Sequence, residues 1–126
     1  MTFDEKLKEL ENIELPKTYN ELLNKVDESI YNCELGLDKA LELCIIASIE
    51  YAKAEKKYKK EYAYNFIKSK KENTSVTILK EYVKSVCNDC YNDIIDAELL
   101  KQISYYHKIK WEEKLQVYKK IKNTRV

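Results

Sequence analysis

The chain has 126 residues, of which 44% are hydrophobic and 36% are charged, and its formal net charge is +1. The hydrophobic content is too high for a disordered chain, and a single glycine and a single proline leave little material for hairpin turns or a glycine-rich phosphate loop. This composition is typical of one domain of long helices with charged outer faces. No stretch approaches the ~20 apolar residues of a membrane span. The opening MTFDEKLKEL is acidic and polar, so we expect no secretory signal and a cytoplasmic protein.

Residues 1–15 are predicted to form a short N-terminal helix. Its apolar residues Phe3, Leu7 and Leu10 are four and three positions apart, which gives one face for docking. Pro16 ends the segment, because proline cannot continue a helix.

A long helix is predicted over residues 18–71. Thr18 and Glu21 have the spacing of a capping box, in which each side chain satisfies a free backbone donor. Gly36 lies alone inside this helix, at a cost of ~1 kcal/mol relative to alanine. The sequence leaves open whether the helix is kinked, split or continuous at Gly36.

The segment ENTSVTIL is the one clear turn, because Asn73, Thr74 and Ser75 favour a helix stop and a new N-cap. A third helix is predicted over residues 75–123. Small or apolar residues recur in it at intervals of three, four and seven, close to the heptad period. They are Leu79, Val83, Val86, Cys90, Ile94, Ala97, Ser104, Trp111, Leu115 and Tyr118.

The two long helices are of similar length and joined by a tight turn, so residues 1–126 are predicted to form a single all-α domain. Its architecture is a long, coiled-coil-like antiparallel helical hairpin with the short N-terminal helix beside it. With a turn at about residue 73, residue i faces roughly residue 146 − i. The acidic stretch 20–45 then lies beside the basic stretch 101–126. The hairpin leaves part of the apolar face of each long helix uncovered. Either a second copy of the chain or the N-terminal helix is expected to cover it.

The four cysteines, Cys33, Cys44, Cys87 and Cys90, are expected to be reduced. Cys87 and Cys90 form a lone CxxC, whereas a zinc site needs further soft ligands at compatible spacing, and His107 is the only histidine. We therefore predict core packing for this pair and no metal.

The segment EYAKAEKKYKKEYAYNFIKSKK, residues 50–71, carries eight lysines and four tyrosines. On a helical wheel most of the lysines fall within one arc, and Tyr51, Tyr58 and Tyr62 fall on the opposite side, as expected of core residues. The predicted partner-binding residues are Lys53, Lys56, Lys57, Lys60, Tyr64, Ile67, Lys68 and Lys71.

The lysine arc has two interpretations, a solvated helix face and a functional surface. The facing segment 75–93 offers little charge to neutralise it, and Tyr64 and Ile67 lie within it, where a solvated face would carry polar residues. A positive stripe with an aromatic residue can follow a phosphate backbone and stack a base. It can equally sit in an acidic groove of a protein. Lysine rather than arginine argues against reading base edges.

Catalysis is not expected. The acids are spread at surface-helix spacing, and the sequence contains no GxxxxGK[ST], HExxH or GxSxG motif. We therefore expect no enzyme, no catalytic residue and no cofactor.

The run YAKAEKKYKKEYA, the turn ENTSVTILKEYV and the basic tail YKKIKNTRV, over about residues 40–126, resemble small helical early proteins of phages and prophages of low-GC bacteria. The pattern is also distantly similar to phage recombination mediators, which bind single-stranded DNA. Many early phage proteins inhibit host machinery, anti-CRISPR proteins among them.

The resemblance implies a non-enzymatic protein that inhibits a host nucleic-acid-processing defence machine, such as a CRISPR effector, by direct protein-protein contact in the bacterial cytoplasm. The alternative is a single-stranded-DNA-binding accessory protein of recombination. A third interpretation is a structural or assembly protein, which requires only the row of small and apolar residues along the long helices.

Overall fold

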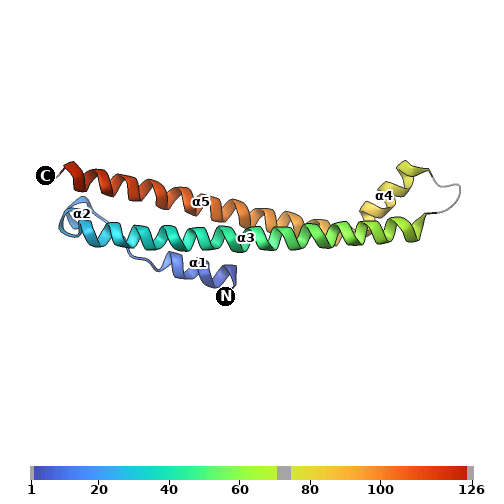
Figure 1. Cartoon of the computed structure of the whole chain (residues 1–126), viewed down its shortest axis with the longest axis horizontal. Coiled ribbons are helices and arrows are strands. Elements are labelled where there is room, and N and C mark those ends of the chain that lie inside the picture. The colour runs from blue at the N-terminus through green and yellow to red at the C-terminus, as the bar shows by residue number, and fades with distance from the viewer. Residues whose placement is uncertain (1, 71–74, 125–126) are drawn as a thin grey trace. The chain divides into compact units, whose positions relative to one another are not determined.

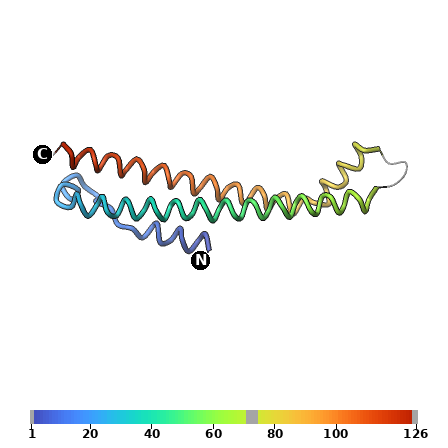
Figure 2. The backbone as a smooth tube through the Cα atoms, in the orientation of Figure 1, coloured from blue at the N-terminus to red at the C-terminus, as the bar shows by residue number. Residues whose placement is uncertain are grey.

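The computed structural model describes residues 2–70 and 75–124, and the regular structure of this part of the chain is helical. The helices, labelled in Figure 1, are α1 (Phe3–Glu11), α2 (Tyr19–Asn24), α3 (Val26–Ser69), α4 (Val76–Val86) and α5 (Asn88–Thr124). α3 packs antiparallel to α5, as the tube in Figure 2 also shows, which confirms the predicted helical hairpin with a short N-terminal helix. No helix in the described ranges combines the length and the apolarity that crossing a membrane requires.

The chain divides into two compact units. The first consists of residues 1–47 and 102–126, and the second of residues 48–101. α3 and α5 therefore each contribute one part to both units, and each unit is described below by itself.

The first unit is organised by a row of small side chains along α3. The buried residues follow one another at alternating intervals of three and four, as in a coiled coil. They are Val26, Ser29, Cys33, Gly36, Ala40, Leu43 and Ala47. Because most of them are small, the backbone of a neighbouring helix can come close to α3 at this row.

Gly36 is in contact with the side chain of Trp111 on α5. Trp111 is only 5% exposed, and a Cβ atom built on Gly36 would overlap its indole ring. α3 is continuous through Gly36, so the glycine does not break the helix. It leaves the space that the indole fills.

The helix predicted over residues 18–71 is interrupted at Lys25. Lys25 has φ −135° and ψ 39°, outside the helical region, and it separates α2 from α3. Leu22 and Val26, on either side of this break, are both buried, so tertiary packing rather than a glycine or a proline sets its place. At its other end α3 stops at Ser69, and Lys71 lies outside the described residues.

The helix predicted over residues 75–123 is also two helices, and they meet at Cys87 with an angle between them that is visible in Figure 1. The buried residues Leu79, Val83 and Cys87 are four apart, whereas Ala97, Ser104 and Trp111 are seven apart. On a straight helix, side chains spaced four apart change direction around the axis much faster along the chain than side chains spaced seven apart. A bend at Cys87, where the spacing changes, keeps both sets turned toward α3.

One residue of the predicted seam was wrong. Val86 is 48% exposed, and the seam passes through Cys87, which is 2% exposed. The prediction counted three residues on from Val83, but α4 continues its four-residue spacing to the bend.

The helix caps agree with the sequence at Thr18. Its hydroxyl accepts a hydrogen bond from the backbone N–H of Glu21 at 3.2 Å, and the Glu21 carboxylate accepts one from the backbone N–H of Lys17 at 3.0 Å. Ser75 occupies the cap position of α4, but its hydroxyl makes no capping hydrogen bond. Asn73 and Thr74, predicted to share that turn, lie outside the described residues.

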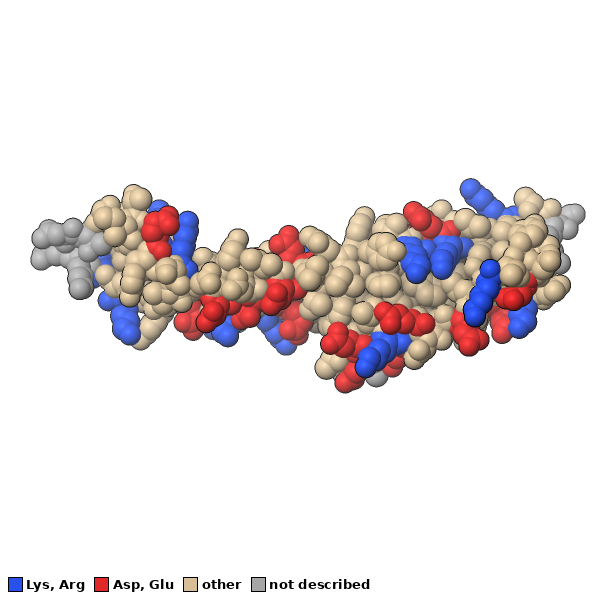
Figure 3. Space-filling view, turned by 180° about the vertical axis from the view of Figure 1, so that it is seen from behind, with Lys and Arg blue, Asp and Glu red and all other residues tan. Residues whose placement is uncertain are grey.

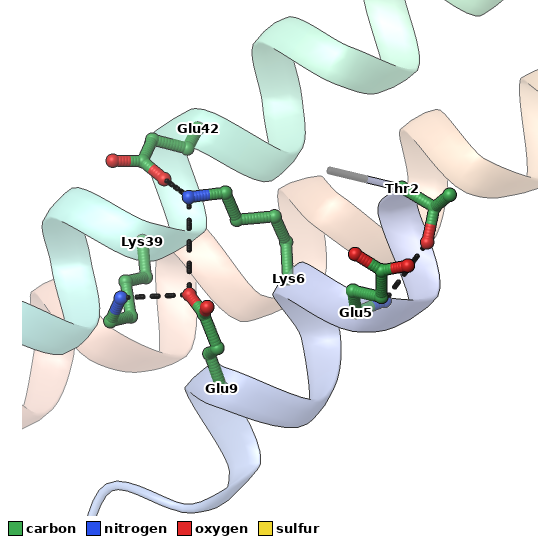
Figure 4. A network of polar contacts seen from close by, with 6 residues as sticks. All are labelled: Thr2, Glu5, Lys6, Glu9, Lys39 and Glu42. Atoms are coloured by element: carbon green, nitrogen blue, oxygen red, sulfur yellow. Dashed lines mark hydrogen bonds and ion pairs between the residues drawn. The ribbon is translucent and has the colours of Figure 1, made fainter.

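α1 docks on α3 by apolar and ionic contacts. Phe3 and Leu10 are buried. Lys6 Nζ lies 2.6 Å from a Glu42 carboxylate oxygen, and Lys39 Nζ lies 2.9 Å from a Glu9 carboxylate oxygen, so the two ion pairs cross between the helices in opposite directions (Figure 4). The hydrogen bond to Glu42 raises the pKa of Lys6, and the bond from Lys39 lowers the pKa of Glu9.

The predicted charge complementarity between α3 and the C-terminal part of α5 is present at the ion pair of Lys122 with Asp27. Lys122 Nζ lies 2.7 Å from Asp27 Oδ1. This pair and the contact of Gly36 with Trp111 lie within about one helical turn of the predicted register. Glu42, another acid of the stretch 20–45, pairs with α1 instead.

Replacing Gly36 by alanine should destabilise the protein, although alanine is the better helix former. The new methyl group would meet the Trp111 ring, and overpacking of this kind costs about 1–3 kcal/mol. Urea unfolding measures the difference. In a Trp111→Leu background, where the ring is absent, the same Gly36→Ala change should instead stabilise the chain; a loss of stability in both backgrounds would contradict this account.

Candidate binding face of helix α3

The predicted binding residues lie on the part of α3 that belongs to the second unit. Seven of the eight are described, and all seven are exposed: Lys53, Lys56, Lys57, Lys60, Tyr64, Ile67 and Lys68. Lys71 lies outside the described residues.

The tyrosines on the opposite side of α3 pack as predicted. Tyr58, Tyr62 and Phe66 contact the buried cluster of Leu79, Val83 and Cys87 on α4 and at the bend. The ring centroids of Tyr58 and Tyr62 lie 6.0 Å apart, and those of Tyr62 and Phe66 lie 6.3 Å apart. Burial raises the pKa of the Tyr58 hydroxyl. This aromatic row fixes the rotation of α3 and so turns the lysines outward.

Tyr51 has a contact that the sequence did not indicate. Lys101 Nζ lies 4.4 Å from the centroid of the Tyr51 ring, a distance at which the cation is attracted to the ring face. The contact places a lysine of α5 directly beside α3.

The expectation that the facing segment offers little charge was wrong at Lys57, and Lys53 has an acid beside it on its own helix. Lys57 Nζ lies 4.0 Å from Asp93 Oδ2 on α5, and Lys53 Nζ lies 3.8 Å from Glu50 one turn earlier on α3. The wheel of a single helix cannot reveal the first of these pairs, because it depends on the register between two helices. Lys53 and Lys57 therefore belong to a groove between α3 and α5 that also holds Asp93 and Asp96.

Four predicted residues that do not line this groove form what we call the outer face: Lys56, Lys60, Tyr64 and Ile67. They follow one another by four, four and three positions and so share one side of α3. Neither lysine makes an ion pair with any residue in the described ranges. Tyr64 is 63% exposed and Ile67 is 75% exposed. Lys68 Nζ lies 5.8 Å from the centroid of the Tyr64 ring.

On the face drawn in Figure 3, acidic and basic side chains intersperse among uncharged surface. A nucleic-acid interface usually presents a continuous basic band. The face in Figure 3 does not have this pattern.

α4 and α5 expose apolar residues in the second unit that were not among the predicted binding residues. Ile78 and Tyr82 on α4 are 66% and 56% exposed, and Ile95 and Leu99 on α5 are 48% and 54% exposed. The signal was present in DIIDAELL, where apolar residues occur on both sides of the seam position Ala97.

The four cysteines are free thiols. Cys87 is buried and accepts a hydrogen bond from the Asn65 side chain at 3.8 Å, and Cys90 is half-buried. Cys33 is fully buried in the small-residue row, and burial raises its pKa to about 11. Within residues 2–70 and 75–124, no three histidine, cysteine or acidic side chains are grouped as metal ligands would be.

No protein-family model matches the chain, and neither a curated protein nor a solved structure matches it significantly.

Alkylation at mildly alkaline pH should divide the thiols into two classes. Cys33 and Cys87 are buried with raised pKa values, so little thiolate is present and the reagent reaches it slowly. Cys44 and Cys90 are half-buried and should react first. Mass spectrometry after timed quenching gives the rates, and the urea-unfolded chain, in which all four should react alike, is the control. Modification of Cys87 as fast as that of Cys90 would contradict the packing described here.

A chelator should leave the melting temperature unchanged, because packing rather than a metal holds Cys87 in place. Cys87→Ala should lower the melting temperature through lost contacts, by more than Cys90→Ala does. Stoichiometric zinc in the purified protein would overturn this prediction.

Proposed function

We propose that the chain is a non-enzymatic binding protein that attaches to another protein through the outer face of α3. One observation carries the proposal. Lys56 and Lys60, which make no ion pair within the described part of the chain, share one side of a helix with the exposed Tyr64 and Ile67. The proposal gives the chain no catalytic role.

The outer face has the layout of a helix that enters a groove. Such helices present side chains at spacings of three and four, with a few apolar anchors that fill pockets. Tyr64 and Ile67 are candidate anchors, since buried aromatic residues contribute most to binding at interfaces. Lys56 and Lys60 then select a partner whose groove is acidic at one end, and they chiefly accelerate association.

The rigidity of the support favours this use. The outer face is part of a helix whose other side is held by Tyr58, Tyr62 and Phe66 against α4. Its side chains are therefore presented without a folding step, which lowers the entropic cost of binding.

In its particular form, the proposal is that the partner is a nucleic-acid-processing defence protein of a bacterial host, such as a CRISPR effector. Binding would take place in the bacterial cytoplasm and would inhibit that protein. This form is supported by the resemblance of residues 40–126 to phage early proteins.

Single-stranded DNA is the second candidate partner. The observation that favours it is the exposed Tyr64 ring with Lys68 beside it and Lys60 one turn away, because bases stack on aromatic rings that cations flank. A structural or assembly role, the third reading of the sequence, has no residue-level observation to distinguish it.

The double reversal Lys56→Glu with Lys60→Glu tests the proposal. The tagged protein is used to isolate its partner from bacterial lysate, and the purified partner is then titrated with each variant. We expect the double reversal to weaken binding roughly tenfold or more and Tyr64→Ala to cost about 2 kcal/mol, as a buried aromatic anchor does. Circular dichroism should be unchanged, since all three side chains are exposed.

Lys80→Glu with Lys84→Glu is the matched control, because it makes the same change of charge at two exposed lysines of α4, which packs on the opposite side of α3 from the outer face. It should leave the affinity for the partner nearly unchanged. A single-stranded oligonucleotide discriminates the second candidate: DNA binding would fall steeply with salt, with a slope of about −0.7 for each phosphate contacted. Equal binding by the wild type and the Lys56/Lys60 variant would refute a role for the outer face.

A further inference from the structure

The groove between α3 and α5 in the second unit has one wall that is net basic and one that is acidic. Its volume is about 510 Å³. Lys53, Lys57 and the acid Glu50 line it on the α3 side, and Asp93 and Asp96 line it on the α5 side. Ala97 is buried between the walls, and Leu99 adds an apolar side chain that is 54% exposed.

The charges in the groove are only weakly satisfied within one chain. The Lys57–Asp93 contact is 4.0 Å long, and both side chains are more than half exposed, at 62% and 55%. Lys53 is 72% exposed and lies 3.8 Å from Glu50 of its own helix. Exposed pairs of this length hold their charges loosely, so both lysines are free to turn toward another molecule.

A surface with one basic wall and one acidic wall is complementary to itself in one orientation. A twofold axis that runs parallel to the two helices places the α3 of one copy over the α5 of the other, and the lysine wall of each copy then faces the aspartate wall of its partner. A twofold axis across the helices would instead place lysines over lysines and aspartates over aspartates. The distribution of charge thus permits the first arrangement and opposes the second.

We propose that this groove is the interface for a second copy of the chain, related by a twofold axis parallel to α3 and α5. The same patch serves both copies, as in most homodimers. Each α3 segment would have its own α5 segment and that of the other copy as antiparallel neighbours, as in four-helix bundles. Leu99, the exposed apolar side chain that lines the groove, would be covered first.

A second copy fits the groove better than an unrelated partner does. An unrelated protein can match a surface of a single sign, whereas this groove needs both signs in matched positions, which the chain itself supplies. The outer face shows the contrasting pattern, with cations alone. The proposal does not depend on the function proposed above, because Lys53, Lys57, Asp93 and Asp96 are not part of the outer face.

Charge reversal of one wall at a time tests the interface. The Lys53→Glu, Lys57→Glu variant has two acidic walls, and the Asp93→Lys, Asp96→Lys variant has two basic walls. Light scattering coupled to size-exclusion chromatography should give the mass of two chains for the wild type and of one chain for each variant. An equimolar mixture of the two variants should return to the mass of two chains, because an acidic copy then faces a basic one.

Lys56→Glu with Lys60→Glu is the matched control here and should keep the mass of two chains while it loses binding to the partner protein. The two proposals can therefore fail separately. Circular dichroism checks that the variants are folded. Leu99→Ser tests the interface without a change of charge, and we expect it to raise the dissociation constant of the dimer roughly tenfold. A wild type that has the mass of one chain at all concentrations, or a mixture that stays monomeric when its components are helical, would overturn the proposal.

Discussion

The packing of the Trp111 indole on the backbone of α3 at Gly36 is the contact on which the alignment of the first unit depends. A row of small residues repeating every seven positions would by itself accept several alignments, since alanine, serine and cysteine offer similar surfaces to a neighbouring helix. The large ring fits only where a Cβ atom is missing. The chain has a single glycine and a single tryptophan, and their contact selects one register between α3 and α5. The lower helix propensity of glycine is the cost of that selection.

Register in turn decides which charges meet. In the first unit it brings Lys122 to Asp27, and in the second unit Lys57 lies beside Asp93. Exposed pairs such as these add little stability, so they result from the alignment and do not produce it. Their importance is in recognition. Lysines only three or four residues apart on α3 have different surroundings. Those that face α5 share a groove with acids, and those on the outer face do not.

The sequence predicted the hairpin, the seam at Ala97, Ser104 and Trp111, and the inward tyrosines, because each depends on a period within one helix. It did not predict the interruptions at Lys25 and Cys87. Neither residue is a helix breaker, and both breaks arise where packing against other helices changes. The wheel placed the lysines on the exposed side of α3, but it could not give the contact of Lys57 with Asp93, because that contact depends on the register between two helices.

The two units differ in how their apolar surface is covered. In the first, α1 adds a third helix, and its Phe3 and Leu10 are buried. In the second, α4 covers only the aromatic row of α3, and the described residues leave both the groove and the outer face open. Under the two proposals these surfaces have separate occupants, so closing the groove leaves the outer face free on each copy. A dimer would then present two identical binding surfaces, and a partner with two sites would be held more tightly by avidity without any additional contact.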